Sequence, residues 1–560
     1  MVKRFFELLE REQRGLHEAA LLLGVFAFLS QLLGFLRDRI LASYFGAGET
    51  LDMYYAAFRI PDFIFIWSAS MVSLSVLIPV LSRKMADSRD SARGFLDTVF
   101  TAFFLFMLAL SAVAFIAAPA LVSLLFPGFD AGQQETVAFL MRIMLLQPVL
   151  LAISNLYGSV TQLMRRFFVY AVSPILYNLG IVIGIIFLYP SMGLAGLAWG
   201  VVLGALLHLA IQVPVIFRSG LLPRFTLRLR LSEIREVALL SLPRTFALSA
   251  QNISVLVLTA LGSLLGAGSI AVFNLSWNLQ AVPLSIIGAS YSVAAFPTLS
   301  GLWNTGNRQA FLDTLLSAVR HIMFWSLPAL VLFVVLRAQI VRTVLGSGAF
   351  DWNDTRLTAA ALALFALSIV AQSLILLFTR AFYAAGKTLV PVTVALIGAS
   401  VTVGGAFFFS NLFETVPVVR YFLESLLRVE DTLGASVLVL PLSYSVGAGV
   451  SAILFMLIFS RRFGGLGRDV FRTFWQSFAA SIIMGFAAYL LLNVFDDIFD
   501  LRTTLGIFFQ GLCAGVGGVA VGTLVLYGLG NTEIREVWLA LHHKFWKAKV
   551  IGPDPAEGTF

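Results

Sequence analysis

The chain has 560 residues, of which 59% are hydrophobic and only 12% are Asp, Glu, Lys or Arg. Soluble domains carry about 25% charged residues, and a mean hydropathy of +0.92 leaves more apolar surface than a water-soluble fold can cover. Composition therefore excludes a soluble protein and a disordered one. The single cysteine, Cys513, and five histidines without an H-E-x-x-H motif indicate neither a disulfide nor a metal site. We expect no cofactor.

Apolar stretches of the length that crosses a bilayer, about 20 residues, recur along the whole chain. Their length does not suit a barrel, whose strands alternate polar and apolar residues over about ten positions. The sequence therefore predicts an all-α polytopic membrane protein with about fourteen transmembrane helices. The expected spans are 18–45, 51–80, 95–126, 136–162, 167–189, 192–217, 237–265, 269–298, 312–345, 357–384, 388–411, 433–460, 472–495 and 503–530.

Basic residues alternate with acidic ones from loop to loop. Lys and Arg gather in the first sixteen residues, in the loops after spans 2, 4, 6 and 12, and in the tail, whereas the opposite loops carry mostly Asp and Glu. Because basic loops stay in the cytoplasm, both termini are predicted to be cytoplasmic. The net charge of +8 then reflects topology, and no nucleic-acid partner is expected.

An internal repeat relates the two halves of the chain. Gly46-Ala47-Gly48 returns as Gly266-Ala267-Gly268, and in the same register Gln31 falls on Gln251. Six spans per copy give a parallel repeat, the architecture of transporters that alternate access. The predicted parts are an interfacial N-terminal helix (1–16), an N-lobe with spans 1–6 (17–217), a cytoplasmic amphipathic linker with a surface helix over 224–236 (218–236), a C-lobe with spans 7–12 (237–460), spans 13–14 (461–530) and a basic tail that anchors to anionic lipid (531–560).

Polar residues inside the spans are functional candidates because they are costly there. Stripes of small and polar residues run along spans 1, 7 and 8, although small residues alone also serve close helix packing. In span 2, Asp52 could be merely interfacial, and Arg59 could simply pair with Asp62 one turn away. The candidates are Arg37, Arg244, Gln31, Gln251, Asn278, Asp38, Asp52, Arg59 and Asn274.

Arginines outnumber acidic residues among these candidates. This predicts an anionic substrate, since guanidinium groups bind phosphate in bidentate fashion. No G-x-x-x-x-G-K-[ST] motif is present, so ATP is not expected to drive the process directly. No catalytic constellation is visible either. We predict a transporter and not an enzyme.

Two neighbouring segments near the start of the chain form a distinctive pattern: Ser30-Gln31-Leu32-Leu33-Gly34-Phe35-Leu36-Arg37-Asp38 and Phe45-Gly46-Ala47-Gly48, followed by Asp52 and Phe58-Arg59-Ile60-Pro61. They resemble the opening of the MurJ (MviN) family of lipid II flippases. Leu242-Pro243-Arg244, Phe296-Pro297-Thr298 and Arg380-Ala381-Phe382-Tyr383 look like further parts of that family. The family belongs to the multidrug/oligosaccharidyl-lipid/polysaccharide exporter superfamily.

The resemblance implies translocation of undecaprenyl-diphosphate-linked peptidoglycan precursor for cell wall biosynthesis and cell shape. Arg37 and Asp52 match family positions, whereas the other span 1 arginine is Gln31 here and the span 8 arginine is Asn278. We hypothesise that Arg37 and Arg244 hold the anion, with Gln31, Gln251 and Asn278 donating hydrogen bonds. By the same resemblance, spans 13 and 14 would form a groove for the lipid tail. A flippase of another polyprenyl-linked glycan, or an envelope-assembly scaffold that does not transport and binds other assembly proteins, remain alternatives.

Overall fold

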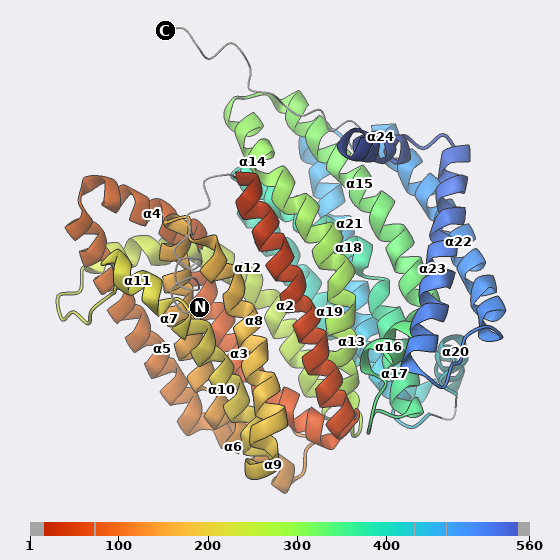
Figure 1. Cartoon of the computed structure of the whole chain (residues 1–560), viewed down its shortest axis with the longest axis horizontal. Helices are drawn as coiled ribbons and strands as arrows, with labels where there is room; N and C mark the ends of the chain where they lie inside the picture. The colour runs from red at the N-terminus through yellow and green to blue at the C-terminus, as the bar shows by residue number, and fades with distance from the viewer. Residues whose placement is uncertain (1–15, 72–73, 431, 466, 547–560) are drawn as a thin grey trace. The chain divides into compact units, whose positions relative to one another are not determined.

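A computed structural model describes residues 16–71, 74–430, 432–465 and 467–546. These residues form helices joined by short turns (Figure 1). The N-terminal interfacial helix predicted over 1–16 lies almost entirely outside the described residues. The helices are α2 Leu16–Phe45, α3 Glu49–Met71, α4 Leu74–Asp87, α5 Arg89–Leu125, α6 Ala131–Met144, α7 Leu146–Leu163, α8 Phe167–Ile183, η1 Gly184–Leu188, α9 Tyr189–Met192, α10 Leu194–Ala210, α11 Val213–Ser219, α12 Leu231–Gly262, α13 Ser269–Pro283, η2 Leu284–Ala289, α14 Ser290–Asn304, α15 Arg308–Val335, α16 Arg337–Leu345, α17 Trp352–Ala366, α18 Ile369–Ala384, α19 Leu389–Thr415, α20 Pro417–Leu427, η3 Ala435–Leu438, α21 Val439–Phe463, α22 Gly467–Asp496, α23 Thr504–Gly528 and α24 Thr532–Trp546.

The helical multi-span class is confirmed. Within the described residues, ten helical runs are long and apolar enough to cross a membrane, and α17 with α18, bent by 43°, makes an eleventh if the pair is one span. Helices α2, α3 and α12 are not among these runs. They correspond to the expected span 18–45, the first part of 51–80, and most of 237–265. Helix α3 carries Asp52, Arg59 and Asp62, which lower its hydropathy. The count of fourteen is therefore not confirmed.

The chain divides into two compact units, each built from separated segments. The first unit comprises Met1–Gln280, Ile340–Ser368 and Gly386–Ser451, and the second comprises Ala281–Gln339, Ile369–Ala385 and Ala452–Phe560. These boundaries cut through the predicted C-lobe, because α12, α17 and α19 group with the first unit. The division into N-lobe and C-lobe stays a prediction.

Glycines allow the closest helix contacts of the first unit. A Cβ on Gly180 of α8 would collide with the backbone of Gly204 on α10, and a Cβ on Gly184 of η1 would meet Gly200. Small residues let backbones of membrane helices approach where no hydrophobic force between helices drives association. The α8–η1 segment and α10 therefore form a tight pair.

The second unit is built around α22, α23 and α15. Gly518 and Gly522 of α23 lie against Ala488 and Met484 of α22, and Gly485 of α22 receives Val331 of α15. This pairing places the predicted spans 13 and 14 side by side. It supplies the framework on which the C-terminal helix α24 docks.

Both copies of the Gly-Ala-Gly motif lie in turns between helices. Gly46 connects α2 to α3 with φ +63°, and Gly266 and Gly268 connect α12 to α13 with φ of +109° and +84°. Positive φ is readily open to glycine but strained for other residues. The two turns are not identical, because only the second has a positive φ at the last glycine of the motif.

The linker departs from the surface helix predicted over 224–236. Residues 221–230 are not helical, and α12 begins at Leu231. The backbone N–H of Arg224 donates to Asp97 and that of Thr226 donates to Thr101, both on α5. Because these N–H groups bond to side chains of another helix, they are not used in an i to i−4 ladder. The helical prediction was wrong for residues 224–230.

Candidate functional site

A charged cluster lies on α2, in the stretch that the sequence predicts as span 1. The Arg37 guanidinium donates from Nε and Nη2 to Asp38 Oδ1 at 2.9 and 2.7 Å, and from Nη1 to Asn178 Oδ1 of α8 at 3.0 Å. The Asp38 side chain is 3% exposed, whereas that of Arg37 is 22% exposed. Asp38 and Asn178 therefore fix the guanidinium of an arginine whose side chain is not fully buried.

Asn278 of α13 joins this cluster from the repeated half of the chain. Its Nδ2 donates to Asp38 Oδ2 at 2.9 Å, so both carboxylate oxygens of Asp38 are engaged. Three of the sequence-predicted residues, Arg37, Asp38 and Asn278, thus meet although 240 positions separate the last two.

A second polar group lies on α3. Arg59 donates from Nη2 to Asn274 Oδ1 of α13, and Asn274 in turn donates to the Ile270 carbonyl at 2.7 Å. Asp62 accepts from Gln147 of α7 at a long 3.4 Å. Arg59 therefore bonds to the candidate Asn274.

Several buried polar atoms near these arginines have no hydrogen-bond partner among the described residues. They are Arg59 Nε, Tyr55 Oη and Gln147 Oε1. Tyr55 lies within electrostatic range of Arg37, Asp38 and Arg59. Buried polar groups in folded proteins are nearly always satisfied by protein, water or ligand, so this set indicates a place where a polar ligand or water binds.

Asp52 has a different position from the other candidates. Its carboxylate, in a residue 2% exposed, accepts from the backbone N–H of Gly268 at 2.6 Å and of Ala271 at 2.7 Å. A carboxylate at a helix N-terminus receives otherwise unpaired N–H groups and a favourable dipole. Asp52 therefore ties α3 to the start of α13.

The remaining candidates are less closely connected. Gln251 of α12 donates to Tyr444 Oη at 3.2 Å, and Tyr444 packs edge-on against Trp277. Gln31 is half-buried on α2. The side chain of Arg244 lies outside the described part of the structure, so the anion site predicted from Arg37 and Arg244 stays a prediction.

Sequence reasoning missed Asn178, Tyr55 and Gln147. Asn178 and Gln147 lie on spans 5 and 4, away from the repeated stripes, whereas Tyr55 lies on α3 between Asp52 and Arg59. The only signal for the two amides is the cost of a polar group inside a membrane helix. That cost marks them as candidates but does not identify their partners.

The cluster offers hydrogen-bond donors and positive charge to an anion. A guanidinium carries five N–H groups, and three of those of Arg37 are used by Asp38 and Asn178. The remaining two suit an oxyanion such as a phosphate oxygen. Asp38 restrains the arginine but also offsets its charge, which favours reversible rather than very tight binding.

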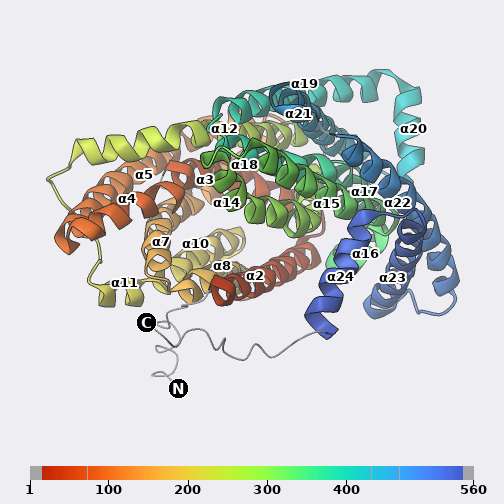
Figure 2. The ribbon, with the colours of Figure 1, turned by 90° about the horizontal axis from the view of Figure 1, so that it is seen from above.

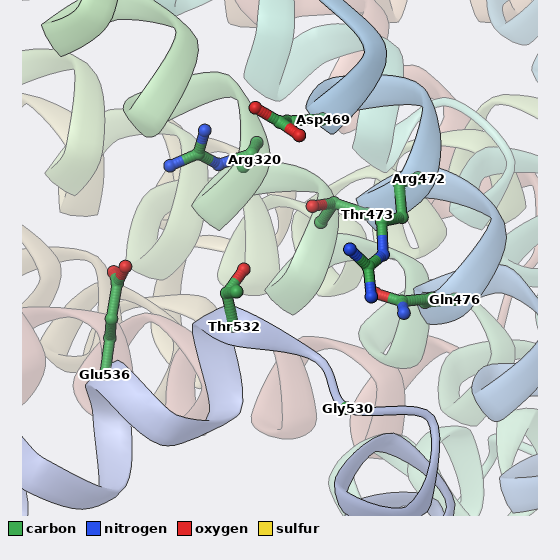
Figure 3. Close-up of a pocket in the computed structure, with 8 residues that line it drawn as sticks. All are labelled: Arg320, Asp469, Arg472, Thr473, Gln476, Gly530, Thr532 and Glu536. Atoms are coloured by element: carbon green, nitrogen blue, oxygen red, sulfur yellow. The ribbon is translucent and has the colours of Figure 1, made fainter.

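The second unit holds a separate polar cleft of about 240 Å³ (Figure 3). It is lined by Arg320 of α15, by Asp469 and Arg472 of α22, and by Thr532 and Glu536 of α24. Both signs of charge are present in equal number, so the lining does not select an anion. In its neighbourhood, Glu533 pairs with Arg320 at 3.0 Å and accepts from Thr473 at 3.0 Å.

The helical fold is shared with solved structures of membrane transporters. A solved structure described as lipid II flippase MurJ in an inward closed conformation matches with a TM-score of 0.73 and 20% identity, covering 92% of this chain and 100% of the other. An inward-facing multidrug resistance MATE family transporter of the MOP superfamily matches with a TM-score of 0.63 and 17% identity over 78% and 95% of the two chains.

The family follows from the sequence comparison. The family model described as lipid II flippase MurJ matches residues 41–509, and the chain belongs to this family. The lipid II flippase MurJ of Burkholderia cenocepacia is 26% identical over 391 residues, 68% of this chain and 76% of that protein. The probable lipid II flippase MurJ of Haemophilus influenzae is 27% identical over 389 residues, 66% and 76% of the two chains.

Proposed function

We propose that this protein moves lipid II from the inner to the outer leaflet of the bacterial cytoplasmic membrane for peptidoglycan assembly. Family membership over residues 41–509 supports this. The observation that carries the mechanism is the partly exposed Arg37 side chain, whose guanidinium is held by Asp38 and Asn178 in predicted span 1. Its uncommitted N–H groups suit the diphosphate of the substrate.

The other polar residues have complementary roles in this proposal. Asn278 holds the second oxygen of Asp38, and Asn274 holds Arg59, so both arginines keep fixed orientations. Arg244, Gln31 and Gln251 are proposed as further donors to the substrate. Fixed donors inside a water-poor site bind an anion without first reorganising.

Alternating access requires one end of the pathway to close while the other opens. The bonds from Gly268 and Ala271 to Asp52 connect α3 and α13 at the turn that the loop charges place outside the cytoplasm. We propose that these bonds close the extracytoplasmic end and that they break when the substrate is released. The proposal rests on the orientation predicted from Lys and Arg.

A second candidate function is the transport of another polyprenyl-diphosphate-linked glycan. The observation favouring it is the pair of amides, Gln31 and Asn278, at positions where the family resemblance leads us to expect arginines. Amides donate hydrogen bonds to sugars as well as to phosphates. Such a protein would bind the shared diphosphate through Arg37 but carry a different headgroup.

Complementation of a lipid II flippase depletion tests the proposal, with surface accessibility of lipid II as the readout. The wild-type chain should expose lipid II, and Arg37→Ala should reduce exposure roughly tenfold to a hundredfold. That range corresponds to losing hydrogen bonds to a charged group, about 1.5–3 kcal/mol. Arg37→Lys should be intermediate, because an ammonium keeps the charge but not the fork.

The matched control is Arg83→Ala, which removes an arginine whose side chain is 68% exposed and pairs with Glu236. It should behave as the wild type. If a well-expressed wild-type chain does not expose lipid II, the result favours transport of another glycan or a scaffold role. If Arg37→Ala and Arg244→Ala both retain full activity, the proposed anion site is wrong.

A further inference from the structure

Helix α20 is a short helix between two predicted spans. It begins at Pro417, directly after α19 ends at Thr415, and Figure 2 shows it turning away from the end of α19. Proline at the first helical position suits this start. The segment therefore lies at one edge of the membrane-spanning region.

The outward face of α20 is apolar. Val418, Tyr421, Phe422 and Leu426 are 75%, 66%, 63% and 60% exposed, and their i, i+3, i+4, i+8 spacing places them on one side of a helix. On the opposite side Glu424 and Leu427 are buried. A helix facing water would show the reverse pattern, with its apolar residues inward.

The charged residues of α20 are used to attach it. Arg420 donates to Glu424 at 2.8 Å and lies 5.9 Å from the centre of the Phe413 ring of α19. Arg356 of α17 donates to the carbonyl oxygens of Arg428 and Glu430 at 2.9 Å each. These contacts hold the helix and the turn after it against α17 and α19.

The apolar face fits lipid better than another protein. It continues from α19, whose Phe407 and Phe408 are also exposed on a helix apolar enough to cross a membrane. Its four side chains offer on the order of 500 Å², below the roughly 800 Å² per partner of a stable protein interface. Aromatic residues prefer the level of the lipid headgroups.

We propose that α20 lies in the headgroup–acyl boundary of one leaflet, with Val418, Tyr421, Phe422 and Leu426 inserted among lipids. Amphipathic helices bind in this way through buried apolar area. The loop charges place this end outside the cytoplasm, so the leaflet is the one that would receive the transported substrate. The contacts of Arg356 and Arg420 then hold α20 and the turn up to Glu430 at the membrane surface.

Site-specific fluorescence in nanodiscs tests this inference on the full chain. Cys513→Ser removes the native cysteine, and Phe422→Cys or Leu426→Cys then carries an environment-sensitive label. Phe407→Cys on α19 is the lipid-facing control, and Glu135→Cys on α6, exposed and in a predicted outer loop, is the water-facing control. Quenching is measured with lipids spin-labelled near the headgroup and with aqueous iodide.

The expected result is a strong loss of fluorescence at 422 and 426 with headgroup-proximal spin-labelled lipid and a weak loss with iodide. Iodide quenching like that at 135, without lipid quenching, would place the face in water and overturn the inference. Quenching by neither agent would mean that a second copy or another protein covers the face, and it would overturn the inference too. Labelling positions 422 and 426 in separate variants shows whether a result is confined to one variant.

Discussion

At the scale of single residues, Asp52 shows how one buried carboxylate links the two copies of the repeat. It lies near the start of α3, and its two hydrogen-bond donors, Gly268 and Ala271, lie 216 and 219 positions later. Gly268 itself packs against the Ala47 carbonyl so closely that a Cβ would collide there. The two turns are therefore in direct backbone contact beside Asp52.

Asp52→Asn is expected to weaken this link. An amide accepts less strongly than a carboxylate and loses the favourable interaction with the helix dipole, so stability should fall by about 1–3 kcal/mol. Thermal denaturation in detergent measures the change, and a cysteine introduced at Ala47 should become more reactive.

Glu49→Gln is the matched control for Asp52→Asn, since Glu49 is an exposed acid in the same first turn of α3. It should leave both readouts unchanged. Equal effects of the two substitutions would show that general charge, and not the bonds to α13, explains the result.

At the scale of elements, α24 is attached to the second unit by a buried acid. Glu533 is 0% exposed and pairs with Arg320 of α15, while Asn531 accepts from the Ile534 N–H and starts the helix. Val525, Ile534 and Val537 pack on the cluster of Phe324, Ala480 and Leu526. Polar and apolar contacts together therefore fix α24 against α15 and α22.

Glu533→Gln should release α24 from this position. Removing one partner of a buried ion pair costs roughly 3–5 kcal/mol, and the loss acts on a single terminal helix, so local opening is expected rather than global unfolding. Hydrogen exchange of residues 532–546 should rise strongly while α22 stays protected. Arg535→Ala, at an exposed position of the same helix, should not change the exchange.

At the scale of the whole molecule, the distribution of Lys and Arg predicts a membrane topology that can be tested. Both termini are predicted to be cytoplasmic, with the turn near Asp130 outside. A green fluorescent protein fused after Phe560 should fluoresce, and alkaline phosphatase fused there should be inactive. Alkaline phosphatase inserted at Asp130 should be active. The opposite pattern would also reverse the leaflet assigned to α20.

Much of the fold was predictable because hydropathy and helical periodicity are local properties. The apolar runs predicted the helices. The exceptions are places where side chains of another helix bond to backbone N–H groups, which a sequence pattern does not reveal. Residues 224–230 are not helical because α5 side chains bond to their N–H groups.

The candidate site was likewise predictable only in part. The cost of charge in a membrane is visible in sequence, so Arg37, Asp38 and Asn278 could be selected from it. Their partners could not, because Asn178 lies 141 positions from Arg37 and is brought there by the packing of α8 on α2. No spacing rule relates residues on different helices.

The sequence by itself determined the membrane environment, the helical class, the expected orientation and the family. Each depends on composition, on local pattern or on a contiguous motif. Only the tertiary structure decided that Asp52 holds a helix start, that Arg59 bonds to Asn274, and that α20 turns its apolar face outward. These outcomes depend on how helices far apart in the chain pack together, and packing is set by the shapes of whole surfaces rather than by neighbours in sequence.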